Sequence, residues 1–312
     1  MGRTKWTKNE IELLEELYKR KASMTEMIAA IPTHPISSIT DKAHNLGFSQ
    51  KYIKPNNGKF KAVYQDYDWC FDCYINKGMT MQEMANLAGC KLRVIQKWCN
   101  EKHHINEWTF KELKKLSSIQ KELISIGTVG DGHIDRREDQ PMYIEVHAEN
   151  QKDYMFWKYS FLKDICAKPP VEVKEKDSKF PNGQIYHCQR QWRLNSRIVF
   201  DLKPIREMSR FDKVKDLSLF QFSLLMLDDG NRELSNWVLC VAAWSENEKD
   251  VFISCCKKKF GFNCWLQSDV RYITFDAQSS RNIDKSILSI VPNELDIIQD
   301  KILSRQNKGS AA

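Results

Sequence analysis

Apolar residues recur at helical spacing along the first fifty positions of the chain. The first periodic segment, WTKNEIELLEELYKR, carries five of them on one helical face: Ile11, Leu13, Leu14, Leu17 and Tyr18. Thr7 lies three residues before Glu10, which is the spacing of a capping box at a helix start. Two shorter periodic segments follow, MTEMIAAIP and HPISSITDKAHNLGF, and the second has Pro35 in its first turn and Gly47 at its end. The pattern predicts three short helices within residues 1–50.

Three short helices in this order are typical of a helix-turn-helix unit, and the segment resembles the Myb/SANT-like variant. The resemblance implies that the third helix, residues 36–46, enters the major groove of DNA. Five polar side chains would then face the bases and phosphates: Ser37, Ser38, Asp41, Lys42 and Asn45. A three-helix protein-interaction module is the alternative that the residues leave open.

Residues 51–65 form a basic segment, KYIKPNNGKFKAVYQ, with a Pro-Asn-Asn-Gly run and no sustained period. This composition predicts a linker. Four lysines in it would either follow DNA phosphates or remain only solvated: Lys51, Lys54, Lys59 and Lys61. The charge alone does not decide between these two roles.

A second helix-turn-helix pattern is predicted over residues 66–108. Within MTMQEMANLAGCKLRVIQKWCNEKHHI, Ala85 is small where two helices would touch, and Gly89 follows four residues later in the turn. The other positions that the pattern predicts to be buried are Met84, Ala88, Cys90, Ile95 and Trp98. The recognition helix would present cationic and amide side chains to phosphates and base edges: Lys91, Arg93, Gln96 and Lys97. This pattern is more specific than the first.

Cys70 and Cys73 form a CxxC pair, which invites a zinc site together with Cys90 and Cys99. However, Cys90 and Cys99 occupy positions that the helix-turn-helix core already uses. Cys70 and Cys73 lie one turn apart in a predicted helix. We therefore expect these four cysteines to be core residues rather than zinc ligands.

Two apolar segments, LISIGTVGDGHI and SLLMLDDGN, are each predicted to form a helix that ends in Asp-Gly. Each is followed by a strand-like run, PMYIEVHA or NWVLCVAA, and then by a nearly identical helix start, ENQKD or ENEKD. Asp131 and Asp229, which end the two motifs, are 98 positions apart, and Glu149 and Glu246, which start the later helices, are 97 positions apart. Because motif and helix recur in register, the chain contains an internal repeat.

At these two motifs the chain resembles the LAGLIDADG homing endonucleases in their single-chain form, with one half at residues 109–210 and the other at residues 211–305. FSLLMLDDG fits the second family motif at nearly every position, and ISIGTVGDG fits the first more loosely. Ile126 stands where the motif often has glycine, and Thr128 would place a hydroxyl inside the packed helix. We therefore expect a looser helix contact at the first motif. The likeness extends over roughly residues 112 to 300.

The resemblance implies an α+β fold. Its core would be a duplicated αββαββα unit with curved antiparallel sheets, preceded by the two small all-α helix-turn-helix domains. Residues 306–312, which end in GSAA, are a tail outside this fold.

The resemblance also implies that the two motif helices pack against each other and bring Asp131 and Asp229 to one edge. At ~5 Å and an effective dielectric constant of ~20, two carboxylates repel each other by about 3 kcal/mol, enough to raise at least one pKa unless a cation lies between them. A divalent cation, Mg²⁺ or another, would relieve this repulsion. Its ligands would be the two acids, with the backbone carbonyls of Gly130 and Asp228 as further ligands. The basic or amide side chain that family members place near each metal site is not identified by the sequence.

The implied activity is metal-assisted hydrolysis of both strands of double-stranded DNA across the minor groove, with Asp131 serving one strand and Asp229 the other. We therefore expect a site-specific DNA endonuclease carried by an intron or another mobile element. Two alternatives use the same scaffold. A non-catalytic transcription regulator is disfavoured by the presence of both acids, and an intron maturase would have intron RNA as its partner.

DNA reading in the core is expected on the exposed face of the curved sheets. In QIYHCQRQWRL, a period of two brings four residues with base-reading chemistry to one face: His187, Gln189, Gln191 and Arg193. Weaker candidates for DNA contact are Lys174, Lys176, Gln267 and Arg271. An ordinary solvated sheet face is the alternative.

Composition is consistent with a polyanionic partner. The protein has 312 residues, 42% of them hydrophobic, and a formal net charge of +7. No apolar run approaches the length of a membrane span, and the N-terminus lacks the apolar core of a signal peptide. Ten cysteines, mostly within apolar stretches, are typical of reduced core residues in an intracellular protein. We expect a monomer that is neither secreted nor membrane-bound and acts in the cytoplasm or wherever the host DNA lies.

Overall fold

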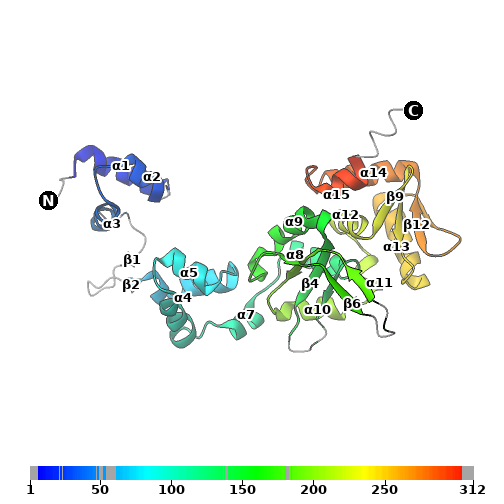
Figure 1. Ribbon diagram of the computed structural model, residues 1–312, viewed down its shortest axis with the longest axis horizontal. Coiled ribbons are helices and arrows are strands. Elements are labelled where there is room, and N and C mark those ends of the chain that lie inside the picture. The colour runs from blue at the N-terminus through cyan, green and yellow to red at the C-terminus, as the bar shows by residue number, and fades with distance from the viewer. Residues whose placement is uncertain are drawn as a thin grey trace. The chain divides into compact units, whose positions relative to one another are not determined.

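The computed structural model describes residues 6–303 apart from 21, 23, 47, 49–51, 54–60, 136, 138–139, 180–182 and 184. Figure 1 follows the chain from its N-terminus in blue to its C-terminus in red. Two compact units are formed, one from Met1–Asp72 with Met81–His104 and the other from Cys73–Thr80 with Ile105–Ala312. Over the described residues, no helix combines the length and the apolar character that crossing a bilayer requires.

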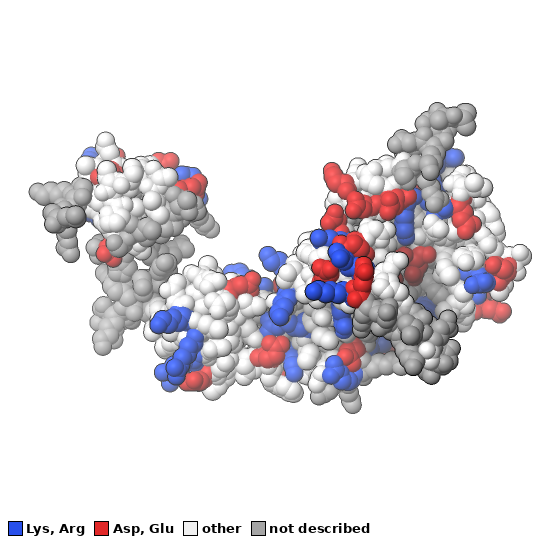
Figure 2. Space-filling model, in the orientation of Figure 1, with Lys and Arg blue, Asp and Glu red and all other residues white. Residues whose placement is uncertain are grey.

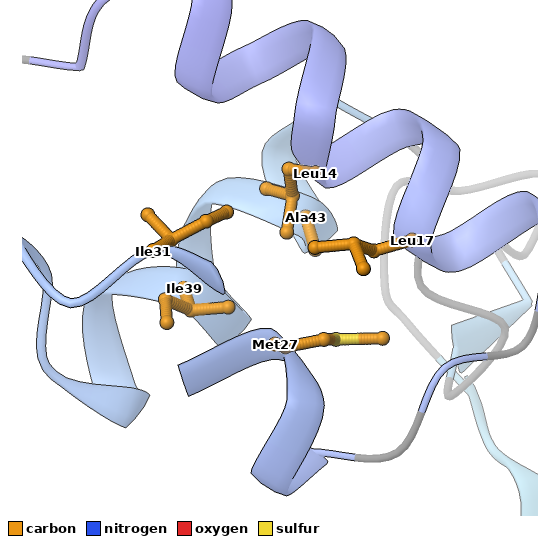
Figure 3. Close-up of a cluster of buried hydrophobic side chains, with 6 residues drawn as sticks. All are labelled: Leu14, Leu17, Met27, Ile31, Ile39 and Ala43. Carbon is orange, nitrogen blue, oxygen red and sulfur yellow. The ribbon is translucent and has the colours of Figure 1, made fainter. Parts of the chain in front are cut away.

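The first three helices are α1 (Lys8–Lys19), α2 (Met24–Ala30) and α3 (Ile36–Asn45). The predicted capping box starts α1, since Thr7 Oγ1 accepts from the backbone N–H of Glu10 at 3.3 Å while Thr7 donates its own N–H to Glu10 Oε2 at 2.8 Å. Figure 3 shows the core that the three helices share: Leu14, Leu17, Met27, Ile31, Ile39 and Ala43. Because every helix contributes to this core, the three short helices stabilise one another.

A second helical cluster follows a short strand pair. Strands β1 (Tyr52–Ile53) and β2 (Lys61–Ala62) pair antiparallel near the two ends of the predicted linker. The helical segments are η1 (Val63–Gln65), α4 (Tyr67–Phe71), the π-helical η2 (Asp72–Asn76), α5 (Met81–Ala88), α6 (Leu92–Gln96) and the π-helical η3 (Lys97–Lys102). Helices α5 and α6 pack together across a turn at Gly89, whose φ of 63° lies in the left-handed region that glycine tolerates. Of the positions that the pattern predicts to be buried, Met84, Ala85 and Ile95 are fully buried. The other three are half-buried: Ala88, Cys90 and Trp98.

The segment Cys73–Thr80 belongs to the second compact unit. Buried Lys114 donates from Nζ to the backbone carbonyl of Asn76 at 2.6 Å and pairs with Asp164 at 2.5 Å. A Cβ on Gly78 would lie 1.7 Å from the carbonyl oxygen of Asp164, so only glycine permits this close approach. The second predicted helix-turn-helix therefore shares residues with the unit that contains the repeat.

The first half of the repeat contains a four-stranded antiparallel sheet in the order β3-β4-β8-β5. Its elements in chain order are α7 (Glu107–Leu113), α8 (Ser118–Gly127), β3 (Gly132–Ile134), β4 (Tyr143–Ala148), η4 (Glu149–Gln151), α9 (Lys152–Leu162), η5 (Lys163–Ile165), β5 (Val171–Val173), β6 (Lys176–Lys179), β7 (Ile185–Cys188), β8 (Gln191–Asn195), η6 (Phe200–Leu202) and α10 (Lys203–Glu207). Strands β6 and β7 form a separate hairpin inserted between β5 and β8. Without that hairpin and the short 3-10 turns, α8 to α10 follow the predicted αββαββα order.

The second half repeats this arrangement with a sheet in the order β11-β12-β10-β9. Its elements are α11 (Arg210–Val214), α12 (Leu219–Asp228), β9 (Gly230–Glu233), β10 (Asn236–Cys240), α13 (Glu246–Phe260), β11 (Cys264–Leu266), β12 (Tyr272–Phe275), α14 (Ala277–Leu288), α15 (Asp296–Ile298) and the π-helical η7 (Gln299–Leu303). From α12 to α14 the order is again αββαββα. The predicted α+β fold with a duplicated core is confirmed.

Helices α8 and α12, one from each half, pack against each other. Both helices start with a serine–glutamine capping box, Ser117 with Gln120 and Ser218 with Gln221. The Ser218 hydroxyl also donates to Glu122 on the other helix. The two helices therefore start with the same kind of cap, and each has ten residues.

The prediction that Thr128 places a hydroxyl inside the first motif helix is wrong by one residue. Helix α8 ends at Gly127, so Thr128 is its C-cap. The Thr128 hydroxyl donates to the carbonyl of Ser125 at 2.7 Å and accepts from Lys213 Nζ at 2.8 Å. Ile126 is fully buried. The polar group thus has partners at the helix end, where a side chain can reach free carbonyls.

The alternation in QIYHCQRQWRL is interrupted at Gln189 and Arg190. Residues before this break form β7, which pairs with β6, and residues after it form β8, which pairs with β4 and β5. The four predicted DNA-reading residues therefore do not share one strand, because His187 lies in β7 while Gln191 and Arg193 lie in β8.

Replacement of Gly127 by alanine should destabilise the protein. A Cβ at this position would lie 2.1 Å from Oη of Tyr143, which is fully buried and donates to Glu145 at 2.9 Å. We expect a loss of about 2 to 3 kcal/mol in the free energy of unfolding, measured by thermal or chemical denaturation. Gly261→Ala is the matched control, since nothing lies within 4 Å of its Cβ and only its φ of 69° opposes alanine. Equal losses in the two variants would contradict the steric explanation.

Candidate active site

The contact between the two motif helices, α8 and α12, is called the seam below. Their C-terminal ends meet at one edge of it. A Cβ on Gly130, just after α8, would lie 3.1 Å from Cβ of Asp228 and 3.3 Å from Oδ2 of Asp229, at the end of α12. Asp131 and Asp228 also place carboxylate oxygens within 4.8 Å of each other. Three aspartates from two distant parts of the chain are therefore gathered in one small region, as the packing of the two motif helices predicts.

Asp228 is held by a buried lysine from the other half. Lys158 on α9 donates from Nζ to both carboxylate oxygens of Asp228, at 2.8 and 2.9 Å. The hydroxyl of Tyr154, one turn earlier on α9, donates to the same carboxylate at 3.0 Å. The side chains of Lys158 and Asp228 are each 1% exposed. The acid that precedes the matched aspartate of the second motif is therefore fully engaged inside the protein.

The other partner of Lys158 is Glu145 on β4, whose side chain is fully buried. Lys158 Nζ lies 2.5 Å from Glu145 Oε1, and the same oxygen lies 2.8 Å from Nε2 of His147. Tyr143 donates to the remaining oxygen at 2.9 Å. Because Tyr143, Glu145 and His147 alternate along β4, one face of the strand supplies all three groups. Burial raises the pKa of Glu145, but Lys158 and His147 outweigh it and hold this pKa below its usual value.

His147 connects this buried network to Asp131. Its Nδ1 lies 2.8 Å from Oε1 of Gln151 and 3.4 Å from Oδ2 of Asp131. Burial lowers the pKa of His147, but the hydrogen bond to Glu145 together with the negative charges of Glu145 and Asp228 outweighs it, and the pKa is raised overall. The side chain of Asp131 is 37% exposed, whereas the imidazole has no exposed surface. The network therefore ends at a carboxylate that solvent can reach.

The two acids that end the sequence motifs, Asp131 and Asp229, are called the outer acids, and the pKa of each is raised. That of Asp131 rises because the group is partly buried and because Asp228 is charged nearby. Burial, followed by the charges of Asp131 and Asp228, raises the pKa of Asp229 from 3.8 to about 6. The prediction that repulsion raises at least one pKa is confirmed, although burial is the larger cause. Nearby cations, Lys158 for both acids, with His147 for Asp131 and Lys301 for Asp229, therefore offset the burial and repulsion only in part.

Lys301, near the end of the described chain, lies beside the same acids. Its Nζ donates to the backbone carbonyls of Leu227 and Gly230, at 2.6 and 2.7 Å. These carbonyls belong to the last turn of α12 and the start of β9, where a cation stabilises the negative end of the helix. Burial lowers the pKa of Lys301, and the three aspartates oppose this.

The oxygen donors of this site fit a hard divalent cation. Asp131, His147 and Asp228 each place one ligand atom within 4.8 Å of the others. However, both oxygens of Asp228 face Lys158, and both ring nitrogens of His147 face hydrogen-bond partners. Among the described residues, none donates a hydrogen bond to the carboxylate of Asp229. Asp131 and Asp229 therefore have the oxygens best able to accept a cation, and Mg²⁺ prefers such ligands.

The sequence of this region matches a known protein family. Residues 123–283 fit the family model of the LAGLIDADG DNA endonuclease family, which covers both motifs and most of both halves. The chain belongs to the LAGLIDADG DNA endonuclease family. No curated protein matches the chain.

Solved structures with some likeness to the chain include three proteins. The homing endonuclease I-WcaI bound to its DNA recognition sequence is 16% identical, with a TM-score of 0.49, over 60% of this chain and 87% of that one. I-DmoI in complex with DNA and Mn is 12% identical, with a TM-score of 0.30, over 54% and 96%. Full-length DUF199/WhiA from Thermatoga maritima is 11% identical, with a TM-score of 0.34, over 61% and 66%. The family assignment depends on the sequence match alone.

The other predicted site residues are scattered over the fold. Lys91, Arg93, Gln96 and Lys97 are all exposed on α6 and the residues that flank it. Exposed side chains outside the helices are Lys174, His187, Gln189 and Arg271, while Gln191, Arg193 and Gln267 are half-buried. Gln267 donates to Thr274 at 2.7 Å and Arg193 to Asn195 at 2.9 Å. In the N-terminal cluster, Ser38 and Lys42 are half-buried. The side chains of Ser37, Asn45 and Lys176 lie outside what the structure describes.

Sequence reasoning did not identify the network behind the acids. Its members are Tyr143, Glu145, His147, Tyr154, Lys158 and Lys301. One signal was available, because Lys158 is the only charged residue in YMFWKYSFL, a segment rich in aromatic side chains. A charge in such a setting needs a buried partner. Of the four cysteines predicted as core residues, Cys70, Cys73 and Cys99 are buried, whereas Cys90 is half-buried.

Asp229→Asn should stabilise the metal-free protein at neutral pH. Because the pKa of Asp229 rises from 3.8 to about 6 on folding, its ionisation begins to disfavour the folded state as the pH rises above about 4, and the full penalty is present above about 6. We expect a gain of at most about 3 kcal/mol at pH 8. The gain should shrink as the pH falls through 6 and vanish below about 4. Thermal denaturation in EDTA at several pH values measures it, and a variant less stable than wild type at pH 8 would contradict the account.

Proposed function

We propose that this protein is a site-specific double-strand DNA endonuclease that hydrolyses phosphodiester bonds with a divalent cation. The observation that carries the proposal is the pair of outer acids, Asp131 and Asp229. Asp131 lies in the turn after α8 and Asp229 is the C-cap of α12, the helix that packs against α8, and both acids have a raised pKa. The family to which the chain belongs is one of DNA endonucleases. A regulator without catalysis would not need to keep two partly buried like charges side by side.

Asp131 and Asp229 would hold the cation, with the backbone carbonyls of Gly130 and Asp228 as further ligands. When bound, Mg²⁺ or a similar ion supplies charge that polarises a phosphodiester and stabilises the leaving oxygen. The chain itself does three things. Its helix seam brings one acid to each strand of the duplex, its buried lysines neutralise part of the excess negative charge, and its folded core limits water around the acids. Asp131 would serve one strand and Asp229 the other.

DNA affinity would come from surfaces outside this site. In the core, the proposed contacts are His187, Gln189, Gln191, Arg193, Lys174, Lys176, Gln267 and Arg271. In the N-terminal helices, they are Ser37, Ser38, Lys42 and Asn45. We propose monomeric action on DNA of a host in which an intron or another mobile element carries this reading frame.

The second helical cluster would add a DNA reader. Arg93, Gln96, Lys97 and Asn100 line a surface recess of about 500 Å³ together with Glu101. In Figure 2, Lys and Arg side chains gather on the part of the molecule that contains α4 and α5. Forked guanidinium and amide groups on one helix face can read base edges, and lysines can bind phosphates.

Cleavage should require both acids and a divalent cation. A randomised DNA pool incubated with the protein and Mg²⁺, followed by sequencing of the cut ends, should give double-strand breaks at one preferred sequence and none in EDTA. Asp131→Asn and Asp229→Asn should each slow cleavage of one strand by at least about a hundredfold while leaving DNA binding intact. Full double-strand cleavage by either variant would refute the metal role.

The double variant Arg93→Ala/Lys97→Ala should weaken DNA binding and shorten the footprint without changing the chemical step. Because Arg93 would read a base edge and Lys97 would bind a phosphate, loss of the Lys97 contact should lower the slope of log affinity against log salt by about one. Lys257→Ala/Lys258→Ala is the matched control, because it removes the same charge from exposed residues of α13 that have no proposed DNA contact. Equal weakening by both pairs would mean that only net charge matters.

A further inference from the structure

The charged network residues of β4 and α9, Glu145, His147 and Lys158, all belong to the first half of the repeat. Gly132 pairs with Glu145 in the first sheet, and Gly230 pairs with Leu239 in the second. Each glycine directly follows its motif acid, so Leu239 occupies the position of Glu145. Two residues further along the chain, Val241 takes the position of His147. Leu239 and Val241 are fully buried. The strand that carries the polar network in the first half is therefore apolar in the second.

The helix that follows the strand shows the same contrast. Glu149 and Glu246 start the two helices with a spacing of 97 residues, and this spacing matches Lys158 with Cys255. Cys255 is buried and carries no charge. The side chain of Cys255 therefore cannot form the ion pair that Lys158 forms at the matching position.

The residue before each motif acid completes the asymmetry. It is Asp228 in the second motif and Gly130 in the first. A Cβ on Gly130 would already lie 3.1 Å from Cβ of Asp228, so the glycine leaves the space that the Asp228 side chain uses. Lys158 belongs to the first half and Asp228 to the second. The ion pair thus joins a lysine of the first half to an aspartate of the second half, and the residues at the two matching positions, Cys255 and Gly130, cannot form the reverse pair.

We propose that Lys158 is a positioning residue that fixes the last turn of α12 through Asp228 and so sets the place of Asp229, with no counterpart for Asp131. This inference rests on the proposed function. Both oxygens of Asp228 are bound by one ammonium group that also contacts Glu145, in a site with almost no exposed surface. Such a bidentate, buried pair restrains the helix end far more than an exposed pair would.

The two acids should therefore respond differently when Lys158 is removed. Asp229 is the next residue after Asp228 and loses its restraint directly. The contacts that join Asp131 to Lys158 run through Glu145 and His147, and Lys158 otherwise acts on Asp131 through its charge rather than through a hydrogen bond. Glu145 keeps its bonds to His147 and Tyr143 without the lysine. Cleavage of the strand that Asp229 serves should consequently depend on Lys158 more than cleavage of the other strand.

Hydrogen exchange with mass spectrometry tests the restraint without any nuclease assay. In Lys158→Met, peptides that cover the end of α12 should exchange about tenfold faster relative to peptides that cover the end of α8. Lys114→Met is the matched control, because it also removes a buried lysine that pairs with an aspartate, and its partner Asp164 contacts Gln120 at the start of α8 rather than the end of either motif helix. It should lower the melting temperature without changing this ratio. An unchanged ratio in Lys158→Met, or an equal change in both variants, would overturn the proposal.

Strand-specific nicking tests the consequence for the reaction. The strand served by Asp229 is the one that Asp229→Asn no longer cuts. In Lys158→Met, cleavage of that strand should slow at least about tenfold more than cleavage of the other. If Lys158→Met does not fold, Asp228→Asn keeps the amide oxygen as an acceptor for Tyr154 and should shift both ratios in the same direction. Equal slowing of the two strands would overturn the proposal, whereas absence of cleavage by the wild-type chain would overturn the proposed function and leave hydrogen exchange to judge the restraint.

Discussion

The packing of α8 against α12 is the constraint on which the rest of the structure depends. Two ten-residue helices with matching serine–glutamine caps lie side by side, and their C-terminal ends meet at one edge. Each end carries an acid. The hydrophobic contact that stabilises the core therefore also forces like charges together, and the raised pKa values of Asp131 and Asp229 express the energetic cost. A binding site for a cation follows from the same contact.

The protein limits this cost in an asymmetric way. Lys158 and Lys301 lie on the inner side of the acids and compensate Asp228, Glu145 and the helix carbonyls, while the two outer acids keep most of their repulsion. Breaking a buried pair by removing one partner typically costs 3–5 kcal/mol, so this compensation belongs to the fold as well as to the site. The second half achieves similar packing with Leu239, Val241 and Cys255, which shows that the fold itself does not require the polar network in both halves.

Much of the fold follows from local sequence patterns. The capping boxes, the apolar periods of the motif helices and the repeat spacing predict α8, α12 and the duplicated core, because each depends on residues near one another in the chain. The pairing of Asp131 with Asp229 followed from the repeat together with the family resemblance. By contrast, the partners of the acids come from β4, α9 and η7, and no local pattern indicates which side chains of those elements meet. The tight contact of Gly127 with Tyr143 has the same origin, since it exists only after the sheet packs on the helix.

The inserted β6–β7 hairpin and the end of α8 show where local patterns fail. An alternating segment gave no sign of the break at Gln189, because the pairing partners of its two parts lie in different sheets. The position of Thr128 depends on where the helix hydrogen bonds stop, which Lys213 from a later helix helps to decide.

The most direct test of the account is the position of the cation itself. Anomalous scattering from Mn²⁺ in crystals of the protein with a selected DNA duplex would locate the ion relative to the helix ends. The account predicts density between the carboxylates of Asp131 and Asp229, with Lys158 still bound to Asp228. Manganese at another surface, with those two carboxylates apart and uncoordinated, would contradict it.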